Sequence, residues 1–325
     1  MHIHSKRIAR IVRLSLMRVA VIANPSSGRG RSLAAAERIC GALAARGIVP
    51  TRLPLDASRA DFAAACAGAR AIVAVGGDGT VRSLAAKVAG GSTPLAIVPT
   101  GTENLAAREF GFLCSPATLA ERILAGNGRV VDMGVIHRAG LPDHEFLIMV
   151  SAGFDADVVA ALGATRRGPV TYITYLRHIL ALLRRWQAPG FVAETVEMPL
   201  EQSSEHGGTP AAHIEASGQL IIANARQYAL RLNPARRADP ADGLLDAVVL
   251  PARGGWSMVR WALRMALTRG QVAGAWSAQG PSWRVEFARP AFIQADGDPV
   301  SGGPVLQMDV TLRPGALQLV DMRGG

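Results

Sequence analysis

The sequence predicts an α/β domain built on a parallel sheet, followed by a β-rich domain with antiparallel strands. From Met17 to about Val130, apolar runs typical of buried strands alternate with helical segments. After that point the segments contain more β-branched residues, alternate partly between apolar and polar side chains, and are separated by Gly, Pro and Asp. The chain has 325 residues, of which 49% are hydrophobic, so it can build two domains with sizeable cores.

The first domain is predicted from four apolar strands that are separated by helical patterns. Strands that alternate with helices pair in parallel and form a sheet covered on both faces. The first helix closes at Gly47, because glycine is favoured just after a helix end. The predicted strands are residues 17–25, 48–55, 71–77 and 93–101, and the two helices between the first three strands are residues 32–47 and 59–69.

The second domain is predicted to contain mostly strands, with two helices near residues 170–186 and 256–268. Its strand segments end at turn residues, as expected for antiparallel hairpins. The predicted strands are residues 130–136, 144–154, 191–199, 213–225, 244–251, 282–296 and 305–314.

The composition favours anionic partners and a reducing compartment. The formal net charge is +10 and comes mostly from arginine, which suits phosphate groups, nucleic acid or an anionic membrane surface without choosing among them. The three cysteines are scattered and lack metal spacing, which favours a cytoplasmic protein over a disulfide framework. No apolar run approaches the roughly 18 residues that span a bilayer. Residues 1–16 are basic and lack a signal-peptide pattern; we expect Met17 to be the true start, with a basic amphipathic arm as the alternative.

The segment GGDGT follows the buried strand at residues 71–77 and precedes a helix, a context that favours phosphate binding. Ligands of parallel α/β sheets bind beyond the carboxyl ends of the strands. Glycines let a phosphate approach the backbone, and a helix N-terminus attracts anions. A carboxylate there would repel phosphate unless a cation lay between them, so Asp78 is a candidate for a Mg²⁺-linked or ribose-binding group. A tight turn with an Asp cap is the structural alternative.

Two more loops with small and hydroxyl-bearing residues follow strands of the same sheet. Short hydroxyls, glycines and arginines can surround phosphate oxygens. Each loop alone is a weak signal, but three such loops at one sheet edge together predict a nucleotide or phosphate site. The residues concerned are Asn24, Pro25, Ser26, Ser27, Gly28, Arg29 and Arg31 in the first loop and Thr100, Gly101, Thr102 and Asn104 in the other.

With NPSSG, GGDGT and PTGTEN in this order and spacing, the chain resembles the diacylglycerol kinase catalytic domain family, which includes bacterial lipid kinases and sphingosine and ceramide kinases. The resemblance continues through SAGFDADV, the segment ANARQYALRLNPARRADPADGLLDAVVL and QADGDPV, and so covers nearly everything from Met17 to the C-terminus. It implies Mg²⁺-dependent transfer of the γ-phosphoryl group of ATP to a lipid hydroxyl. It also implies a doubly wound nucleotide-binding domain, a β-sandwich-like domain and an active site in the cleft between them. The final strand would return to the first domain, which gives residues 17–130 with about 312–325 for one domain and 131–311 for the other.

The resemblance also assigns roles to individual residues. In Asp296-Gly297-Asp298, Asp298 would take the place of the general base that accepts the hydroxyl proton. An accessory metal loop would use the Asp242 carboxylate and the carbonyls of Asp239 and Leu244, a set of oxygens that suits Mg²⁺. A plain hairpin turn and a solvated acidic turn are the alternatives. The implied nucleotide and Mg²⁺ contacts are Asn24, Pro25, Ser26, Ser27, Gly28, Gly76, Gly77, Asp78, Gly79, Thr80, Val81, Arg82, Ser83, Thr102 and Asn104.

Three departures from the family pattern bear on these roles. Arg82 and Ser83 stand where the family usually has Asn and Glu, and Pro54 replaces a threonine that would contact the nucleotide. Asp298 replaces Glu and is one methylene shorter, although a displacement of about 1 Å can matter greatly to positioning.

These departures leave two other functions open: a kinase of another hydroxyl compound, such as an NAD-kinase-like enzyme, and a catalytically impaired protein that binds nucleotide or lipid. The acceptor lipid is open as well. Nucleic-acid binding is not expected, because no aromatic-interleaved basic patch is present.

The lipid side of the predicted site is less clear. The helix near 170–186 would place apolar side chains on one face, either lining an acyl-chain entrance or packing on its own domain. Basic pairs at 166–167 and 236–237 could face the inner surface of the membrane. A kinase at that surface would take part in lipid metabolism and phospholipid biosynthesis. Pairing of exposed sandwich strands leaves a homodimer open. The apolar face would contain Tyr172, Tyr175, Leu176, Ile179, Leu183 and Trp186, with Arg177, Arg184 and Arg185 elsewhere on the helix.

Overall fold

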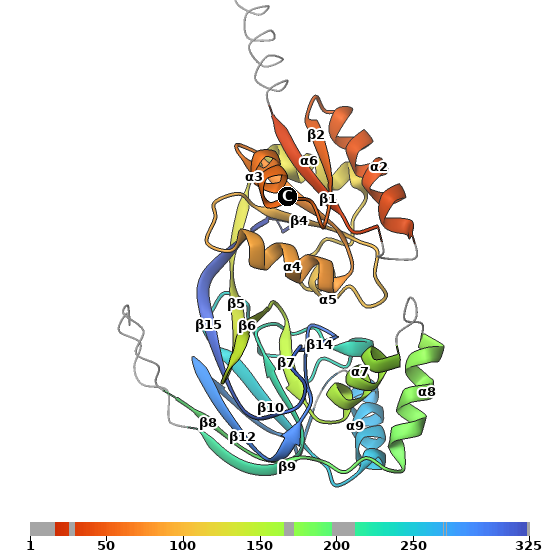
Figure 1. Ribbon diagram of the computed structural model, residues 1–325, viewed down its shortest axis with the longest axis vertical. Coiled ribbons are helices and arrows are strands. Elements are labelled where there is room, and N and C mark those ends of the chain that lie inside the picture. The colour runs from red at the N-terminus through yellow and green to blue at the C-terminus, as the bar shows by residue number, and fades with distance from the viewer. Residues whose placement is uncertain are drawn as a thin grey trace, which may run out of the picture. The chain divides into compact units, whose positions relative to one another are not determined.

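The computed structural model describes residues 17–25, 30–165, 172–196, 212–268, 270 and 272–323. The chain forms two compact units, Met1–Val131 with Gly315–Gly325, and Asp132–Pro314. Figure 1 labels their helices and strands, and each unit is described by itself. In the described part of the chain, no helix combines the length and apolar character that a membrane span requires.

The first unit is a parallel α/β sheet whose central strands are fully covered. β1 and β3 are buried along almost their whole length, as expected from their continuous apolar sequences. The strand order β4-β3-β1-β2 is parallel throughout. The strands are β1 (Arg18–Ala23), β2 (Val49–Pro54), β3 (Ala71–Gly76) and β4 (Leu95–Pro99), and the helices are α2 (Arg31–Ala44), α3 (Arg59–Cys66), α4 (Asp78–Val88), α5 (Leu105–Glu109) and α6 (Pro116–Ala125).

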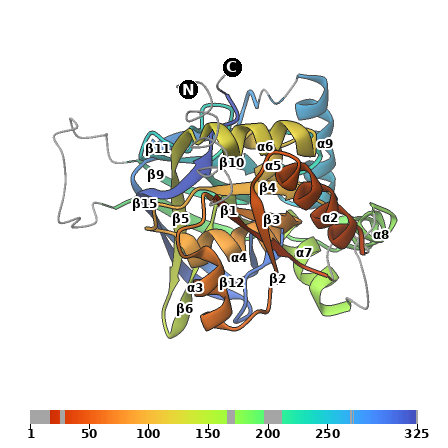
Figure 2. The ribbon, with the colours of Figure 1, turned by 90° about the horizontal axis from the view of Figure 1, so that it is seen from above.

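Helices cover both faces of this sheet, as Figure 2 shows. On one face α2 and α6 are joined by an ion pair between Arg46 and Glu121 at 2.5 Å. On the other, the ammonium group of Lys87 in α4 lies 5.5 Å from the centre of the Phe62 ring in α3. The chain leaves β1 in one direction to form β2 and then returns past β1 to form β3. This reversal places a topological switch point between the carboxyl ends of β1 and β3, where doubly wound sheets bind ligands.

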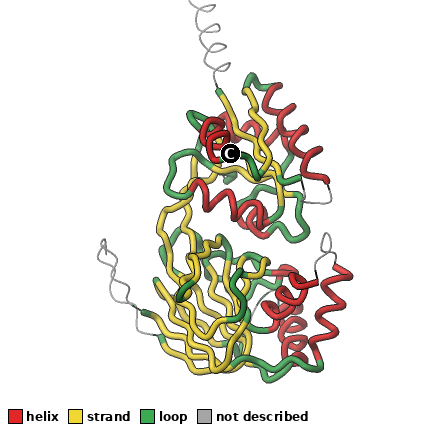
Figure 3. Tube along the Cα trace, in the orientation of Figure 1, coloured by secondary structure: helices red, strands yellow, loops and turns green. Residues whose placement is uncertain are grey.

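The second unit is an antiparallel β-sandwich-like domain with helices gathered at one side, as Figure 3 shows. β9 pairs with β8 along its first half and with β7 and β10 along its second half, which links the layers. The apolar core includes the fully buried Trp283, whose ring meets that of Trp276 edge-on at 6.0 Å. The strands are β5 (Gly128–Arg138), β6 (Leu141–Phe146), β7 (Met149–Ala152), β8 (Gly190–Thr195), β9 (His213–Ala223), β10 (Leu245–Pro251), β11 (Trp276–Gly280), β12 (Ser282–Ala291), β13 (Ile293–Ala295), β14 (Asp298–Pro299) and β15 (Val305–Val320), and the helices are α7 (Phe154–Thr165), α8 (Tyr172–Leu183), α9 (Gly255–Leu267) and the short 3₁₀ turn Ala229–Arg231.

β15 is a single strand of 16 residues that contributes to both units. Its first part pairs with β12 in the sandwich, and Leu319 near its end pairs in parallel with Leu95 of β4. The backbone N–H of Gly90 also donates to the carbonyl of Ala316 at 2.7 Å. The last residues of the chain are therefore part of the first unit.

The predicted fold class, α/β followed by a β-sandwich-like domain, is confirmed, but several elements differ from the prediction. Helix α7 was not predicted from the sequence, because its apolar residues are distributed around the helix and its sequence shows no periodic polar face. Strand β11 was also missed, and the last strand is longer than predicted.

The predicted apolar face of α8 is covered in part. Leu183 and Trp186 are buried in a cluster with Phe154, whereas Leu176 is 53% exposed. The side chains of Tyr172 and Tyr175 and the pair 166–167 lie outside the described residues.

Candidate active site

The loop after β1 is tied to the loop after β3 through Asn24. The Asn24 backbone N–H donates to the carbonyl of Val75 at 3.2 Å, and its side-chain amide donates to the Thr80 hydroxyl at 3.2 Å. The Asn24 carbonyl accepts a hydrogen bond from the Ser32 hydroxyl of α2 at 2.6 Å. Asn24 therefore fixes where the chain leaves β1. Pro25 is exposed beside it, and the predicted contacts Ser26, Ser27 and Gly28 lie outside the described residues.

The GGDGT segment forms the end of β3 and the start of α4, and its glycines are required by close contacts. A Cβ atom on Gly76 would lie 2.4 Å from the Cβ of Thr80, a buried residue one helical turn later. Gly77 is the N-cap of α4 and has an extended backbone. A Cβ on Gly101, in the loop after β4, would lie 2.9 Å from the Cα of Gly77. Two glycine backbones therefore approach each other at this edge of the sheet.

The loop after β4 is held by Asn104 and by contacts to the other two loops. Asn104 has a left-handed backbone with φ of 51°, and its side chain bonds both the N–H and the carbonyl of Gly101, at 2.8 and 3.0 Å. The Thr100 N–H donates to the Gly76 carbonyl at 2.9 Å, and the Arg31 guanidinium donates to the Thr100 carbonyl at 3.3 Å. The structure thus brings together the three loops that the sequence singled out.

Asp78 has a structural contact in this cluster that its predicted role did not include. Its carboxylate accepts a hydrogen bond from the Ala106 N–H at 3.1 Å, in the first turn of α5. A carboxylate at a helix start also interacts favourably with the positive end of the helix dipole. Asp78 therefore links the start of α4 to the first turn of α5.

The remaining predicted nucleotide contacts differ in exposure. Val81 is 1% exposed and can offer a ligand only its backbone, whereas Thr102 is exposed in the loop before α5. Gly79, Arg82 and Ser83 are partly exposed in the first two turns of α4.

Asp298 stands at the end of a two-residue hairpin in the second unit. Asp296 and Gly297 form the turn with positive φ angles of 51° and 87°, which places Asp298 opposite Ala295. The Asp296 carboxylate is buried and accepts hydrogen bonds from three consecutive backbone N–H groups, those of residues 147–149, at 2.8 to 3.1 Å. The first aspartate of the motif thus holds the turn, and the second remains partly exposed.

A buried polar network behind this hairpin was not predicted. The Gln294 side-chain oxygen accepts from the Gly297 N–H at 2.8 Å, while its amide donates to Ser151 at 2.6 Å and to Asp155 at 3.1 Å. Asp155 also accepts from the hydroxyl of Tyr228 and from Gln219. A glutamine within an apolar strand is the sequence signal that could have pointed to it, because buried amides need partners.

The predicted metal loop is a turn whose carboxylate is crowded by others. The Asp242 N–H donates to the Asp239 carbonyl at 3.3 Å, and the Asp242 carboxylate accepts from the Leu244 N–H at 2.9 Å. Buried Asp132, which the sequence did not single out, accepts from the Gly243 N–H at 2.9 Å. Burial, and then the neighbouring Asp239 and Asp132 carboxylates, raise the pKa of Asp242, while the Leu244 N–H opposes the rise. Burial likewise raises the pKa of Asp246.

Oxygen ligands of this kind suit a hard cation, and a cation bound there would offset the repulsion between the carboxylates. In the described part of the chain, no group of three or more His, Cys, Asp or Glu side chains has an arrangement suited to a metal. The predicted set contains one carboxylate and two carbonyls, so it stays a prediction. Asp78, the other predicted metal contact, belongs to the other unit.

Comparison with known proteins identifies the family of both units. The diacylglycerol kinase catalytic domain matches residues 18–136, and the YegS C-terminal NAD kinase beta sandwich-like domain matches residues 148–321. The second match alone covers more than half of the chain. The chain belongs to the diacylglycerol kinase family of lipid kinases. The resemblance stated from the sequence motifs is thereby confirmed, and so is the prediction of a lipid kinase.

Individual relatives from this family cover most of the chain. A diacylglycerol kinase of Mycobacterium tuberculosis is 30% identical over 237 residues, which are 70% of this chain and 72% of that protein. A Pseudomonas aeruginosa protein described as "Probable lipid kinase YegS-like" is 29% identical over 283 residues, 81% of this chain and 80% of its own. The crystal structure of a diacylglycerol kinase from Bacillus anthracis shares the fold with a TM-score of 0.65, 19% identity, and coverage of 94% of this chain and 97% of its own.

Proposed function

We propose that this lipid kinase transfers the γ-phosphoryl group of ATP to the hydroxyl group of a lipid at the inner face of the cytoplasmic membrane. The observation that carries the proposal is the joining of three loops at the switch point of the parallel sheet. Asn24 bonds Thr80, Gly76 bonds Thr100 and Asp78 bonds Ala106.

In this proposal the three loops bind the triphosphate. The glycines at positions 76, 77 and 101 let the loops after β3 and β4 pack closely together, and the N-terminus of α4 supplies a positive dipole end that attracts phosphate. Arg82 adds a cation in the second turn of α4. Phosphoryl transfer depends mainly on such positioning and on neutralising charge.

Asp298 is the proposed general base. Its carboxylate accepts the proton of the lipid hydroxyl while the hydroxyl oxygen forms a bond to the γ-phosphorus. The bond between the γ-phosphorus and the β–γ bridging oxygen breaks, and the products are a lipid phosphate monoester and ADP. The hairpin supports this role because Asp296 and Gln294 fix the turn and leave Asp298 as its partly exposed carboxylate.

Mg²⁺ bound with the nucleotide would neutralise charge on the phosphates. Asp78 is the residue proposed to interact with it, while Asp242 and the carbonyls of Asp239 and Leu244 would hold an accessory ion that stabilises their turn.

The test is incubation of the full chain with γ-labelled ATP, Mg²⁺ and a total lipid extract, followed by mass analysis of the labelled product. A labelled lipid phosphate supports the proposal. Labelling of added NAD instead of lipid would indicate the NAD-kinase-like alternative. The description of the matched sandwich domain as NAD kinase-like is the reason to include NAD in the assay. ATP binding without ADP release would indicate a binding protein.

Asp298→Asn tests the base in the same assay. We expect turnover to fall by about 10²- to 10⁴-fold with ATP binding unchanged. The matched control is Glu215→Gln, which removes an exposed carboxylate from β9 of the same domain and should leave turnover unchanged. Normal turnover of Asp298→Asn would refute the assignment.

A further inference from the structure

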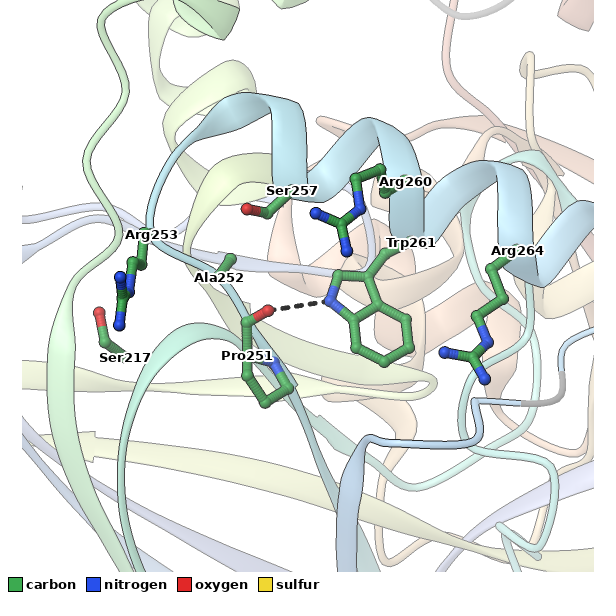
Figure 4. A pocket seen from close by; sticks show the side chains of 8 residues that line it. All are labelled: Ser217, Pro251, Ala252, Arg253, Ser257, Arg260, Trp261 and Arg264. Atoms are coloured by element: carbon green, nitrogen blue, oxygen red, sulfur yellow. Dashed lines mark hydrogen bonds between the residues drawn. The ribbon is translucent and has the colours of Figure 1, made fainter.

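A cationic groove lies along helix α9 in the second unit, and none of its lining residues belongs to the candidate active site. It has a volume of about 450 Å³. Figure 4 shows side chains from α9, from the segment before it and from β9 that line the groove. Three arginines and two serines line it, and no carboxylate does, so the groove suits an anion that accepts hydrogen bonds. The lining residues are Ser217, Pro251, Ala252, Arg253, Ser257, Arg260, Trp261 and Arg264.

The groove is supported by fixed contacts. The Trp261 indole N–H donates to the Pro251 carbonyl at 2.9 Å, and the Arg264 guanidinium lies 5.7 Å from the centre of the Trp261 ring. Within the described ranges, none of the ion pairs involves Arg253, Arg260 or Arg264. Among the described residues, no carboxylate therefore pairs with these three positive charges.

The outward face of the same helix combines these cations with large apolar side chains. Trp256, Leu263 and Leu267 are 61%, 59% and 84% exposed. At 100° per residue they fall on one arc of α9 together with Arg260, and Arg264 lies at the edge of that arc. No acidic residue occurs in α9. An exposed tryptophan and two leucines beside arginines are typical of helices that lie in a membrane interface.

The mixture of side chains decides which anionic partner fits best. Nucleic acid would satisfy the arginines but would leave Leu263 and Leu267 in water. A free phosphate could occupy the groove without touching the outward face. An anionic bilayer accommodates both, because its headgroups carry phosphate and its acyl region accepts apolar side chains.

We propose that α9 docks on the surface of a bilayer that contains anionic phospholipid. Trp256, Leu263 and Leu267 enter the interface, and Arg253, Arg260 and Arg264 hold a headgroup phosphate in the groove. The inference goes beyond the proposed function, because phosphoryl transfer to a lipid does not say which surface meets the membrane.

The test is sedimentation of the full chain with vesicles, without ATP, so that its result does not depend on catalysis. We expect binding to vesicles of phosphatidylcholine with phosphatidylglycerol, weak binding to phosphatidylcholine alone, and a decrease with added salt. The triple variant Arg253→Gln/Arg260→Gln/Arg264→Gln should bind the anionic vesicles about 100-fold more weakly, since each cation near such a surface contributes roughly a factor of five. Leu263→Ser/Leu267→Ser should also weaken binding, because it removes the apolar contribution.

Matched controls lie on β15 in the same unit. Leu306→Ser changes a leucine that is 58% exposed, and Arg313→Gln changes an exposed arginine, so both should bind like the unaltered protein. Vesicle binding in the presence of soluble glycerophosphate distinguishes binding of a headgroup phosphate in the groove from docking of the apolar face on the bilayer. Partial competition that leaves the leucine-dependent binding intact supports the proposal, whereas complete release would reduce the site to one for a free anion and overturn it.

Two other results would also overturn the proposal. Equal binding of the triple variant and the unaltered protein to anionic vesicles would exclude the groove, and α9-dependent binding to a DNA duplex in preference to vesicles would indicate nucleic acid. In parallel, phosphorylation of a detergent-dispersed lipid is measured for the unaltered protein and for every variant. If the unaltered protein phosphorylates the dispersed lipid but does not bind anionic vesicles, the docking surface is refuted and the proposed function stands.

Discussion

The side-chain oxygen of Gln294 lies 2.8 Å from the backbone nitrogen of Gly297 and accepts its hydrogen bond, so a buried amide holds the turn that presents Asp298. The amide nitrogen of Gln294 donates in turn to Ser151 and Asp155, from β7 and α7. We expect Gln294→Leu to lower turnover by about 10- to 100-fold with little change in ATP affinity, because displacement of a base by about 1 Å can cost a factor of 100. Steady-state kinetics with ATP and lipid varied separately measures this.

The same experiment needs to separate positioning from instability. Gln294→Leu removes the acceptor of the Gly297 N–H and one of the donors to Ser151 and Asp155, at a cost of about 1–3 kcal/mol in the free energy of unfolding. Gln294→Glu keeps the acceptor for Gly297 but faces the Asp155 carboxylate, so it should lose stability yet retain more turnover than Gln294→Leu. Gln307→Leu, at an exposed position of β15, is the control. Equal turnover of the two Gln294 variants would contradict a positioning role.

Two substitutions at Asp78 distinguish its contact with Ala106 from its proposed role toward Mg²⁺. Asn keeps a side-chain oxygen for the Ala106 N–H but removes the charge, whereas Ala removes both. We expect Asp78→Asn to keep the melting temperature and to raise the KM for Mg²⁺–ATP, and Asp78→Ala to lower the melting temperature as well. Unchanged kinetics of Asp78→Asn would assign Asp78 to structure alone.

Removal of divalent ions should affect the Asp242 turn. Because burial and the neighbouring carboxylates raise the pKa of Asp242, its charged form destabilises the fold at pH above that raised pKa. Asp242→Asn should therefore unfold at the same or a higher temperature than the unaltered protein in EDTA, and should lose the stabilisation that Mg²⁺ gives the unaltered protein. Thermal unfolding with EDTA and with Mg²⁺ tests both statements, and an identical Mg²⁺ response of the two proteins would reduce the loop to a turn.

Asp157 predicts a pH dependence of stability. Its carboxylate is held by the Trp186 indole N–H at 2.7 Å, but burial dominates and raises its pKa, with Asp155 adding to the rise. The folded protein therefore retains a proton that the unfolded chain releases. The free energy of unfolding of the unaltered protein, relative to that of Asp157→Asn, should fall as pH rises from the ordinary pKa of 3.8 to the raised pKa of Asp157, and should then stay level.

Urea unfolding of both proteins across this range measures the difference. Asn can still accept the indole hydrogen bond, so any pH dependence of the difference belongs to the charge. A difference that does not change with pH would contradict the raised pKa.

The first unit and its loops were predictable because their signals are local. Each loop directly follows an apolar strand, and the carboxyl ends of parallel strands lie at one edge of the sheet. The proximity of Asn24, Asp78 and Asn104 follows from that rule. The individual hydrogen bonds of these residues do not follow from that rule. The bond between Asp78 and Ala106, for example, depends on where α5 begins.

The second unit was less predictable because its contacts join residues far apart in the chain. Gln294 and Asp155 are 139 residues apart, and nothing in either local segment specifies the other. The apolar period of α8 alone does not reveal which of its turns are covered by the rest of the domain. Leu183 and Trp186 pack with Phe154 and Val158 of α7, a helix whose own sequence has no periodic polar face.

The path of β15 has a consequence for how the protein is made. The strand that borders β4 follows all the other described strands in the chain, so that edge of the parallel sheet stays uncovered until β15 has been synthesised. Everything that the sandwich needs from β5 to β14 has been synthesised by then. The first unit is thus begun before the sandwich and completed after it, and a chain that stops before β15 would keep an open sheet edge in that unit.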